Sequence, residues 1–323
     1  MIETNKQNRF RRFGILTIAA VFFLIFVGGL VRSTGSGMGC PDWPKCFGYL
    51  VPPTDVSQLP DDYKTKFAVA GKEIADFDVY KTWTEYINRL IGVVIGFLIL
   101  LTVIFAFPYL KSNNKKIFWL SFLAFILVGY QGWIGSKVVS SDLSVYMITI
   151  HMLLALVIVA LLIYTVTASQ DFVIHQYQTY KPLKTLVLFT LLISLVQTVS
   201  GTQVREMVDE VAKRFDDRNV WVDQLGLLFK AHRSWSLLNL GMSAFLMFKF
   251  KNLFDRHSLL YKASLALLLL MSTQALTGAV LANLGFPAQF QSIHLTLGSL
   301  TAGLQIFIAI LVFTKIKFNK ENV

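Results

Sequence analysis

The chain has 323 residues, of which 54% are hydrophobic and only 15% are charged, and its formal net charge is +11. About a quarter of the residues in an ordinary soluble protein are charged, so this composition excludes that class. The basic residues do not gather on one element with interleaved aromatic residues, which argues against a nucleic-acid partner.

Apolar stretches of roughly 20 residues, the length that crosses a bilayer, recur along the chain between polar patches. We identify eight, near residues 14–31, 90–108, 117–135, 146–168, 184–203, 234–250, 261–282 and 292–314. The sixth is the weakest, because it is diluted by Ser234, Ser236, Asn239 and Ser243. The sequence therefore predicts an all-α membrane protein with eight transmembrane helices and no separate soluble domain.

The first apolar stretch follows a basic head, as a signal peptide does. It is longer than a typical secretory core and no small-residue cleavage site follows it, so we expect a true span. The short N-terminal segment before this stretch also leaves no room for a mitochondrial transit peptide, so we expect the protein to lie in a bacterial inner membrane.

The charges sort the loops between the predicted spans into two sets. Loops on the side of the N-terminus hold 16 Lys and Arg and 4 acidic residues, whereas the opposite set holds 12 and 15. Basic loops stay in the cytoplasm, so we expect both termini to be cytoplasmic.

An internal repeat organises the chain. The segments QGWIGSKVV (131–139) and QALTGAVLA (274–282) share a Gln-x-x-x-Gly motif, and each precedes a helix entrance with a histidine, His151 or His294, at an offset of 143 residues. Packing explains the glycines, because small residues let helices approach closely.

Two further pairs extend this repeat. GGLVR (28–32) resembles GTQVR (201–205), and Asn88-Arg89 corresponds to His232-Arg233 at an offset of 144. We therefore expect two pseudo-repeated four-helix bundles, residues 1–170 and 171–323, of which the first has a longer outer loop at 32–86.

The five histidines fall into two groups. His175 and His257 lie among polar neighbours in cytoplasmic loops and are expected to be solvated surface residues. His151, His232 and His294 each lie at the outer entrance of a predicted span, where ionisable residues are functional candidates. A hydrogen bond to a neighbouring helix is the structural alternative for each.

The histidine pattern favours haem over zinc. Zinc takes three or four ligands, but each half offers at most two histidines. A haem iron needs only one or two axial ligands, so His232 and His294 are predicted to form a bis-histidine haem site. Arg205 and Arg233 are candidates for the haem propionates, and Arg89 is grouped with them as a cofactor-binding residue.

The first outer loop contains both cysteines of the chain, in GMGCPDWPKCFG (37–48). In an oxidising compartment two isolated cysteines form a disulfide, so we expect a Cys40–Cys46 bond. The spacing is not that of a thioredoxin-type motif, and it leaves open whether the bond is structural or redox-active.

In these features, over essentially the whole chain, the sequence resembles the haem A synthases. The resemblance rests on the eight spans in tandem halves, the Cys-Pro-x-Trp-Pro-x-Cys loop, the Glu-x-x-x-Arg entrance at Glu85 and Arg89, and the three entrance histidines. This family oxidises a porphyrin methyl group of haem O to the formyl group of haem A. The resemblance implies a haem b in the C-terminal half and the substrate haem O in the N-terminal half.

One position departs from the family pattern. The second span of the family opens with Glu-x-x-His-Arg, whereas this chain has Asn88 at the histidine position. His151 is then the one strong axial candidate in the N-terminal half, which leaves one face of the iron open to O2. Asn88 is a hydrogen-bond donor or weak ligand there, and Glu85 is a proton-relay candidate. The rival interpretation is a decayed site.

Two other functions compete with this interpretation. One is a non-catalytic haem carrier or assembly factor for cytochrome oxidase, and the other is a b-type electron-transfer protein that oxidises quinol. For the enzyme, the expected partners are haem O synthase, the cytochrome oxidase assembly machinery, membrane lipid, and quinol or another electron donor.

Overall fold

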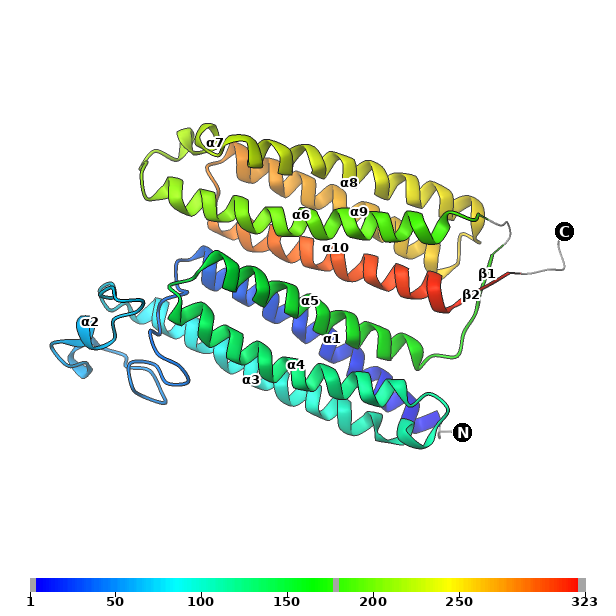
Figure 1. The fold of residues 1–323 in the computed structure, drawn as a ribbon, viewed down its shortest axis with the longest axis horizontal. Helices are drawn as coiled ribbons and strands as arrows, with labels where there is room; N and C mark the ends of the chain where they lie inside the picture. Colours follow the sequence, from blue (N-terminus) through cyan, green and yellow to red (C-terminus); the bar gives the residue numbers. More distant parts are fainter. Residues whose placement is uncertain (1–3, 177–179, 319–323) are drawn as a thin grey trace. The chain divides into compact units, whose positions relative to one another are not determined.

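The computed structural model describes residues 4–176 and 180–318, and in this range the chain is mostly helical (Figure 1). The long helices of the described part are α1 (Thr4–Ser33), α3 (Val79–Ala106), α4 (Lys116–Ser140), α5 (Val145–Ala168), α6 (Leu183–Ala212), α8 (Gly226–Leu253), α9 (Leu259–Asn283) and α10 (Ala288–Thr314). The short elements are η1 (Val56–Gln58), α2 (Tyr63–Lys66), η2 (Phe107–Lys111), β1 (Ile174–Gln176), η3 (Arg218–Val220), α7 (Trp221–Gln224) and β2 (Ile316–Phe318).

Seven helices in the described ranges are long and apolar enough to cross a membrane. The prediction of a helical, multi-pass membrane protein is therefore confirmed. Helix α8 is not among the seven, since it contains the polar residues that weaken the sixth predicted span. The eighth crossing stays a prediction.

The chain divides into two compact units, Met1–Ile158 (unit 1) and Val159–Val323 (unit 2). In unit 1, α1 and α4 both pack against α3, and the hydroxyls of Thr17 and Thr102 join α1 to α3 at 2.9 Å. The boundary between the units falls within α5.

Unit 2 contains a four-helix bundle in which every helix has two neighbours. Helix α6 packs against α8 and α10, and α9 packs against the same two helices. Helices α8 and α10 therefore occupy opposite corners of this bundle. A core that includes Leu246, Phe250, Leu260, Leu267 and Ile308 fills one end of it.

Helix α3 begins earlier than the apolar stretch that predicts it. The Asp78 carboxylate accepts hydrogen bonds from the backbone N–H groups of Tyr80 and Lys81, at 2.9 and 3.1 Å, and caps the first turn. Such a cap supplies partners for N–H groups that a helix start leaves unsatisfied. The cap places Glu85, Asn88 and Arg89 within the first three turns of α3.

Helix α6 extends beyond the expected end of its span near residue 203. Val204, Val208 and Val211 lie on one face of this extension and pack in a cluster with residues that include Trp221 and Phe229. Part of the outer loop 204–230, which is predicted to connect the fifth and sixth spans, is therefore a helix. Its apolar residues recur at helical spacing and pack against a neighbouring apolar surface.

Two short strands interrupt the helical pattern. Strand β1, in the linker before α6, pairs in parallel with β2, which follows α10, with Ile174 opposite Ile316. The backbone N–H of Ile174 also donates to the carbonyl of Lys315 at 2.8 Å. The segments before and after the four-helix bundle of unit 2 are thus hydrogen-bonded to each other.

The first outer segment has a small core of its own. Cys40, Cys46, Phe47, Leu59 and Tyr63 are buried together. The Phe47 ring packs edge-on against three other aromatic rings at centroid distances of 5.5 to 6.3 Å. This packing fixes the path of the chain between α1 and α3.

Candidate functional site

The two entrance histidines of unit 2 lie at equivalent places on opposite corners of its bundle. His232 is on the second turn of α8 and His294 is on the second turn of α10. Both side chains are partly buried. A site between these helices has an imidazole on each side, which is the donor set of a six-coordinate haem.

Each of these histidines has a hydroxyl group at its Nδ1 atom. The Ser200 Oγ atom, on α6, lies 2.9 Å from Nδ1 of His232. The Thr277 Oγ1 atom, on α9, lies 2.9 Å from Nδ1 of His294. Both hydroxyls belong to the helix that precedes the histidine helix in the chain, so the two contacts are built alike.

A glycine follows each of these hydroxyl residues and makes room for the imidazole. A Cβ atom on Gly201 would lie 3.2 Å from Cε1 of His232, and one on Gly278 would lie 3.2 Å from Cε1 of His294. These separations are tighter than usual carbon contacts. The glycines therefore allow close helix packing, as predicted, and in particular close packing against the histidine rings.

Glutamine side chains support the same helix pairs. Gln197 Nε2 donates to the backbone carbonyl of His232 at 2.8 Å, and it also lies 3.2 Å from the Nδ1 atom of that ring. The Oε1 atom of Gln274 accepts a 3.3 Å hydrogen bond from Thr301 on α10. A Cβ atom on Gly298 would lie 2.9 Å from Nε2 of Gln274, so a larger residue there would displace the Gln274 amide.

Unit 1 repeats part of this arrangement around His151. Gln131 on α4 donates to the backbone carbonyl of His151 on α5 at 2.9 Å. A Cβ atom on Gly135 would lie 3.5 Å from Cε1 of His151. Within the described residues, however, the buried Nδ1 atom of His151 has no hydrogen-bond partner.

Asn88 lies on α3, at the position that corresponds to His232. Its Oδ1 atom is buried and has no hydrogen-bond partner among the residues that the structure describes. A Cβ atom on Gly28 of α1 would lie 3.9 Å from this oxygen. A glycine of the preceding helix therefore faces Asn88 as Gly201 faces His232.

Glu85 and Arg89 join helix α3 to the cysteine loop. Glu85 is only 4% exposed, and its Oε2 atom accepts the backbone N–H of Cys40 at 2.9 Å. The Arg89 guanidinium donates to Glu85 Oε1 through Nε and Nη2, at 3.1 and 2.5 Å. It also donates to the carbonyls of Asp42, Lys45 and Cys40 at 2.7 to 3.0 Å. All five guanidinium N–H groups are thus engaged.

The predicted disulfide is confirmed, since Cys40 and Cys46 are bonded and fully buried. The loop lies directly on α3: Thr82 Oγ1 donates to the carbonyl of Gly39 at 2.9 Å. A Cβ atom at Gly39 would lie 2.4 Å from the carbonyl oxygen of Lys81, so only glycine fits there.

The remaining arginine candidates lie near the histidine end of unit 2. Arg205 follows Gly201 by one turn of α6 and forms an ion pair with Asp209 on the same helix. Arg233 is adjacent to His232 in the chain and is exposed. Their assignment to haem propionates stays a prediction.

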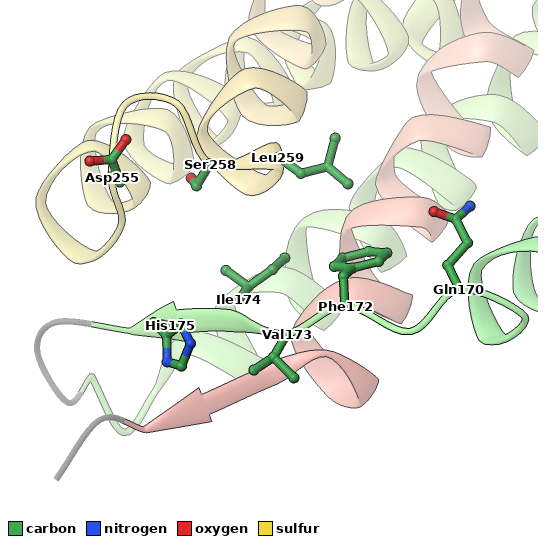
Figure 2. Close-up of a pocket in the computed structure, with 8 residues that line it drawn as sticks. All are labelled: Gln170, Phe172, Val173, Ile174, His175, Asp255, Ser258 and Leu259. Atoms are coloured by element: carbon green, nitrogen blue, oxygen red, sulfur yellow. The ribbon is translucent and has the colours of Figure 1, made fainter.

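The two histidines that the sequence places at the surface are apart from these sites. His175 is exposed on β1, and His257 follows Asp255, whose carboxylate accepts the His257 backbone N–H. Figure 2 shows His175 at the edge of a shallow pocket between β1 and the turn before α9. The other lining residues are Gln170, Phe172, Val173, Ile174, Asp255, Ser258 and Leu259.

Several residues of the sites are not among the sequence predictions. Ser200, Thr277, Gln131 and Gln197 all contact a histidine ring or its backbone. A third copy of Gln-x-x-x-Gly, at 197–201, is the sequence signal that points to two of them.

Fold and site together define a multi-pass helical membrane protein with a candidate bis-histidine centre. The family model COX15-CtaA, described as cytochrome oxidase assembly protein, matches residues 11–306. The chain belongs to this family.

Individual relatives are similar to the chain over shorter or longer stretches. Proteins named heme A synthase from Alkalihalophilus pseudofirmus and Shewanella oneidensis are 28% and 30% identical over 167 and 183 residues, 51% and 55% of this chain. The matches span only about half of these two relatives, 48% and 52%. The heme A synthase of Shouchella clausii is 25% identical over 316 residues, which cover 94% of this chain and 96% of the relative.

Proposed function

We propose that the protein is a haem A synthase, an oxidoreductase that uses O2 to convert a methyl group of haem O to the formyl group of haem A for cytochrome oxidase. The observation that carries the proposal is the pair of similarly supported histidines in unit 2 of a chain from the COX15-CtaA family. The name of the relatives, heme A synthase, supports the same reaction.

In the proposed enzyme, unit 2 binds a haem b between His232 and His294. Their placement on opposite corners of the bundle supports this assignment. Arg205 and Arg233, at the same end of the bundle, would meet the propionates through charge-assisted hydrogen bonds. This haem would carry electrons to the substrate.

In unit 1, His151 would hold the substrate haem O. A haem bound there supplies iron for chemistry with O2. Asn88 would face the substrate as a hydrogen-bonding amide, because a carboxamide is a far poorer iron ligand than an imidazole.

Glu85 is the residue of unit 1 that we expect to move a proton, at its Oε2 atom. This atom accepts the Cys40 backbone N–H at 2.9 Å, so the cysteine loop fixes its position. Arg89 would act beside it by holding the carboxylate and the loop together, rather than by direct contact with a propionate, since its N–H groups are engaged.

The proposed topology has eight spans in the bacterial inner membrane, with α8 as the sixth and both termini in the cytoplasm. It comprises two pseudo-repeated halves, residues 1–170 with the haem O site and 171–323 with the haem b site. The recurring pairs of a glycine with the residue that it faces support this division: Gly28 with Asn88, Gly135 with His151, Gly201 with His232, and Gly278 with His294.

The proposed partners follow from the reaction. Haem O synthase would supply the substrate, cytochrome oxidase assembly would consume the product, and quinol or another donor in the membrane would supply electrons. The family description as a cytochrome oxidase assembly protein supports the second of these links.

Co-expression with a haem O synthase, followed by mass analysis of the extracted haems, tests the reaction. We expect haem A or its hydroxymethyl precursor to appear, and the His151→Ala variant to yield neither. Unchanged haem O bound to the wild-type protein would identify a haem carrier instead. A protein that holds only haem b and reacts with quinol would be an electron-transfer protein.

A further inference from the structure

We propose that Ser200 and Thr277 are positioning residues that fix the imidazoles of His232 and His294 for iron, and that Ile134 withholds this support from His151. Because of this difference, unit 2 retains its haem b, whereas unit 1 releases its product haem. The inference deepens the proposed function and rests on it.

The geometry of the hydroxyl contacts favours one histidine tautomer. A threonine hydroxyl has a single proton, and that of Thr277 is donated to the backbone carbonyl of Gln274 at 2.9 Å. The same oxygen lies 2.9 Å from Nδ1 of His294, and both contacts are hydrogen bonds at once only when it accepts the proton of an Nδ1–H group. His294 then has its lone pair on Nε2, where an axial ligand needs it.

Ser200 gives the same result for His232. Its hydroxyl donates to the backbone carbonyl of Gln197 at 2.8 Å and lies 2.9 Å from Nδ1 of His232. The Gln197 amide is farther from this ring nitrogen, at 3.2 Å, and makes its shorter bond to the His232 backbone. The Gln197 amide also lies 3.4 Å from Nε2 of this ring, so the Ser200 hydroxyl, which makes the shortest contact, is the acceptor that we assign to an Nδ1 proton.

A hydrogen bond from the second ring nitrogen has a known effect on a metal-bound histidine. It fixes the orientation of the ring and raises the basicity of the ligating nitrogen. A more basic ligand stabilises ferric iron, so the two hydroxyls are expected to lower the reduction potential of the unit 2 haem and to slow its loss.

In unit 1 this support is missing at one specific residue. Thr277 precedes Gly278, and Ser200 precedes Gly201, but the residue before Gly135 is Ile134. Ile134 is buried and cannot accept a hydrogen bond. The Nδ1 atom of His151 correspondingly has no partner among the described residues.

The backbone of His151 is supported as that of His232 is. Gln131 holds the backbone of His151 at 2.9 Å, as Gln197 holds that of His232 at 2.8 Å. The helix that carries His151 is therefore supported like the helix that carries His232, while the His151 imidazole lacks a hydrogen bond at Nδ1 and is expected to be the less basic ligand. These are suitable properties for a ligand that must accept a substrate and let a product go.

The test uses the full-length protein and the near-isosteric variant Thr277→Val. We expect its unit 2 haem to have a higher reduction potential in a redox titration and to transfer to apomyoglobin roughly tenfold faster, in line with the loss of a second-shell partner. Thr277→Ser keeps a hydroxyl group, so it should have the reduction potential and the haem release rate of the wild-type protein. Thr273→Val is the matched control, because Thr273 is one turn away on α9 and its exposed hydroxyl bonds, among the described residues, only to the Leu269 carbonyl.

The reciprocal variant tests unit 1. Ile134→Thr should give His151 an acceptor and slow the release of haemin, used as the probe, from unit 1. A readout that needs no haem is ¹⁵N NMR of labelled histidine in the haem-free protein, which should show His294 as the Nδ1–H tautomer and lose that preference in Thr277→Val.

The outcomes separate this inference from the proposed function. If Thr277→Val leaves the potential, the release rate and the tautomer as in Thr273→Val, the positioning role is wrong, even where haem A is made. If the shifts occur but no haem A is formed, the positioning role stands and the enzymatic function fails. Should Thr277→Val not fold, Ile134→Thr decides: unchanged haemin release from unit 1 would overturn the proposal.

Discussion

Glu85 and Arg89, one turn apart on α3, form an ion pair of 2.5 Å whose side chains are only 5% and 14% exposed. Each partner also binds the backbone of the cysteine loop, Glu85 at Cys40 and Arg89 at three carbonyl groups. The pair therefore attaches the cysteine loop to α3, the helix that carries Asn88.

Arg89→Ala should release the cysteine loop. It leaves the Glu85 carboxylate buried without its cation, which costs about 3–5 kcal/mol. We expect a lower unfolding temperature and faster reduction of the Cys40–Cys46 bond by a membrane-impermeant phosphine, followed by thiol quantitation.

Lys64→Ala is the control for this experiment. Lys64 pairs with Asp76 in the same segment, but the two side chains are 42% and 88% exposed, and such surface pairs contribute little to stability. Equal rates of disulfide reduction in Arg89→Ala and Lys64→Ala would contradict the role of Arg89 in attaching the loop to α3.

The side of the membrane on which the cysteine loop lies can be measured directly. In intact spheroplasts, an impermeant thiol reagent should label Cys40 and Cys46 after reduction and neither before it. Labelling without reduction would contradict the disulfide, and absence of labelling from outside after reduction would reverse the proposed orientation.

Replacing His232 or His294 by alanine should remove the low-spin haem spectrum of the C-terminal half, because each supplies one axial position. His175→Ala and His257→Ala serve as controls, since both residues lie outside the histidine end of unit 2. If all four variants give the same spectrum, the bis-histidine assignment is wrong.

Gly278→Ala should disturb the same haem without removing a ligand. The added Cβ would lie 3.2 Å from Cε1 of His294, so the ring or the helix must shift by a few tenths of an ångström. We expect altered low-spin absorption bands and weaker haem retention. Gly241→Ala on α8 is the matched control, because nothing lies within 4 Å of its Cβ position and alanine favours the helix by about 1 kcal/mol.

Asn88→His addresses the departure from the family pattern. With His151 as its one histidine ligand, the unit 1 haem should be high-spin and bind carbon monoxide. The substitution should convert that haem to low spin, because a neutral imidazole is the better ligand. Electronic absorption with and without carbon monoxide measures the change. A wild-type haem that is already low-spin and unreactive would show that another side chain ligates the iron.

The sequence predicts the helices well because crossing a membrane imposes long apolar stretches that can be counted. It is less informative where contacts are long-range. Glu85 and Arg89 look like a proton relay and a cofactor ligand by spacing alone, and only the folded loop shows their bonds to Cys40, Asp42 and Lys45.

The contacts of the Ser200 and Thr277 hydroxyls with histidine could not be predicted from the sequence for a different reason. Serine and threonine are common in membrane helices, and Ser200 and Thr277 differ from others such as Thr273 only in the direction that they face. The repeat contains a partial signal, since Gln197 and Gly201 form a third Gln-x-x-x-Gly motif. Its unit 1 counterpart has Leu24 before Gly28, so the glutamine and the histidine are both replaced in that helix pair.

The pairing of β1 with β2 has a consequence for the engineering of this chain. Since Ile174 and Ile316 are opposite each other, the two segments that flank the four-helix bundle of unit 2 are spatial neighbours. A circular permutation that joins them by a short linker and opens the chain in the exposed turn near Asp216 would preserve every helix of the bundle. This four-helix bundle, with its two strands, thus has the geometry of a segment that can be transferred or duplicated as one block.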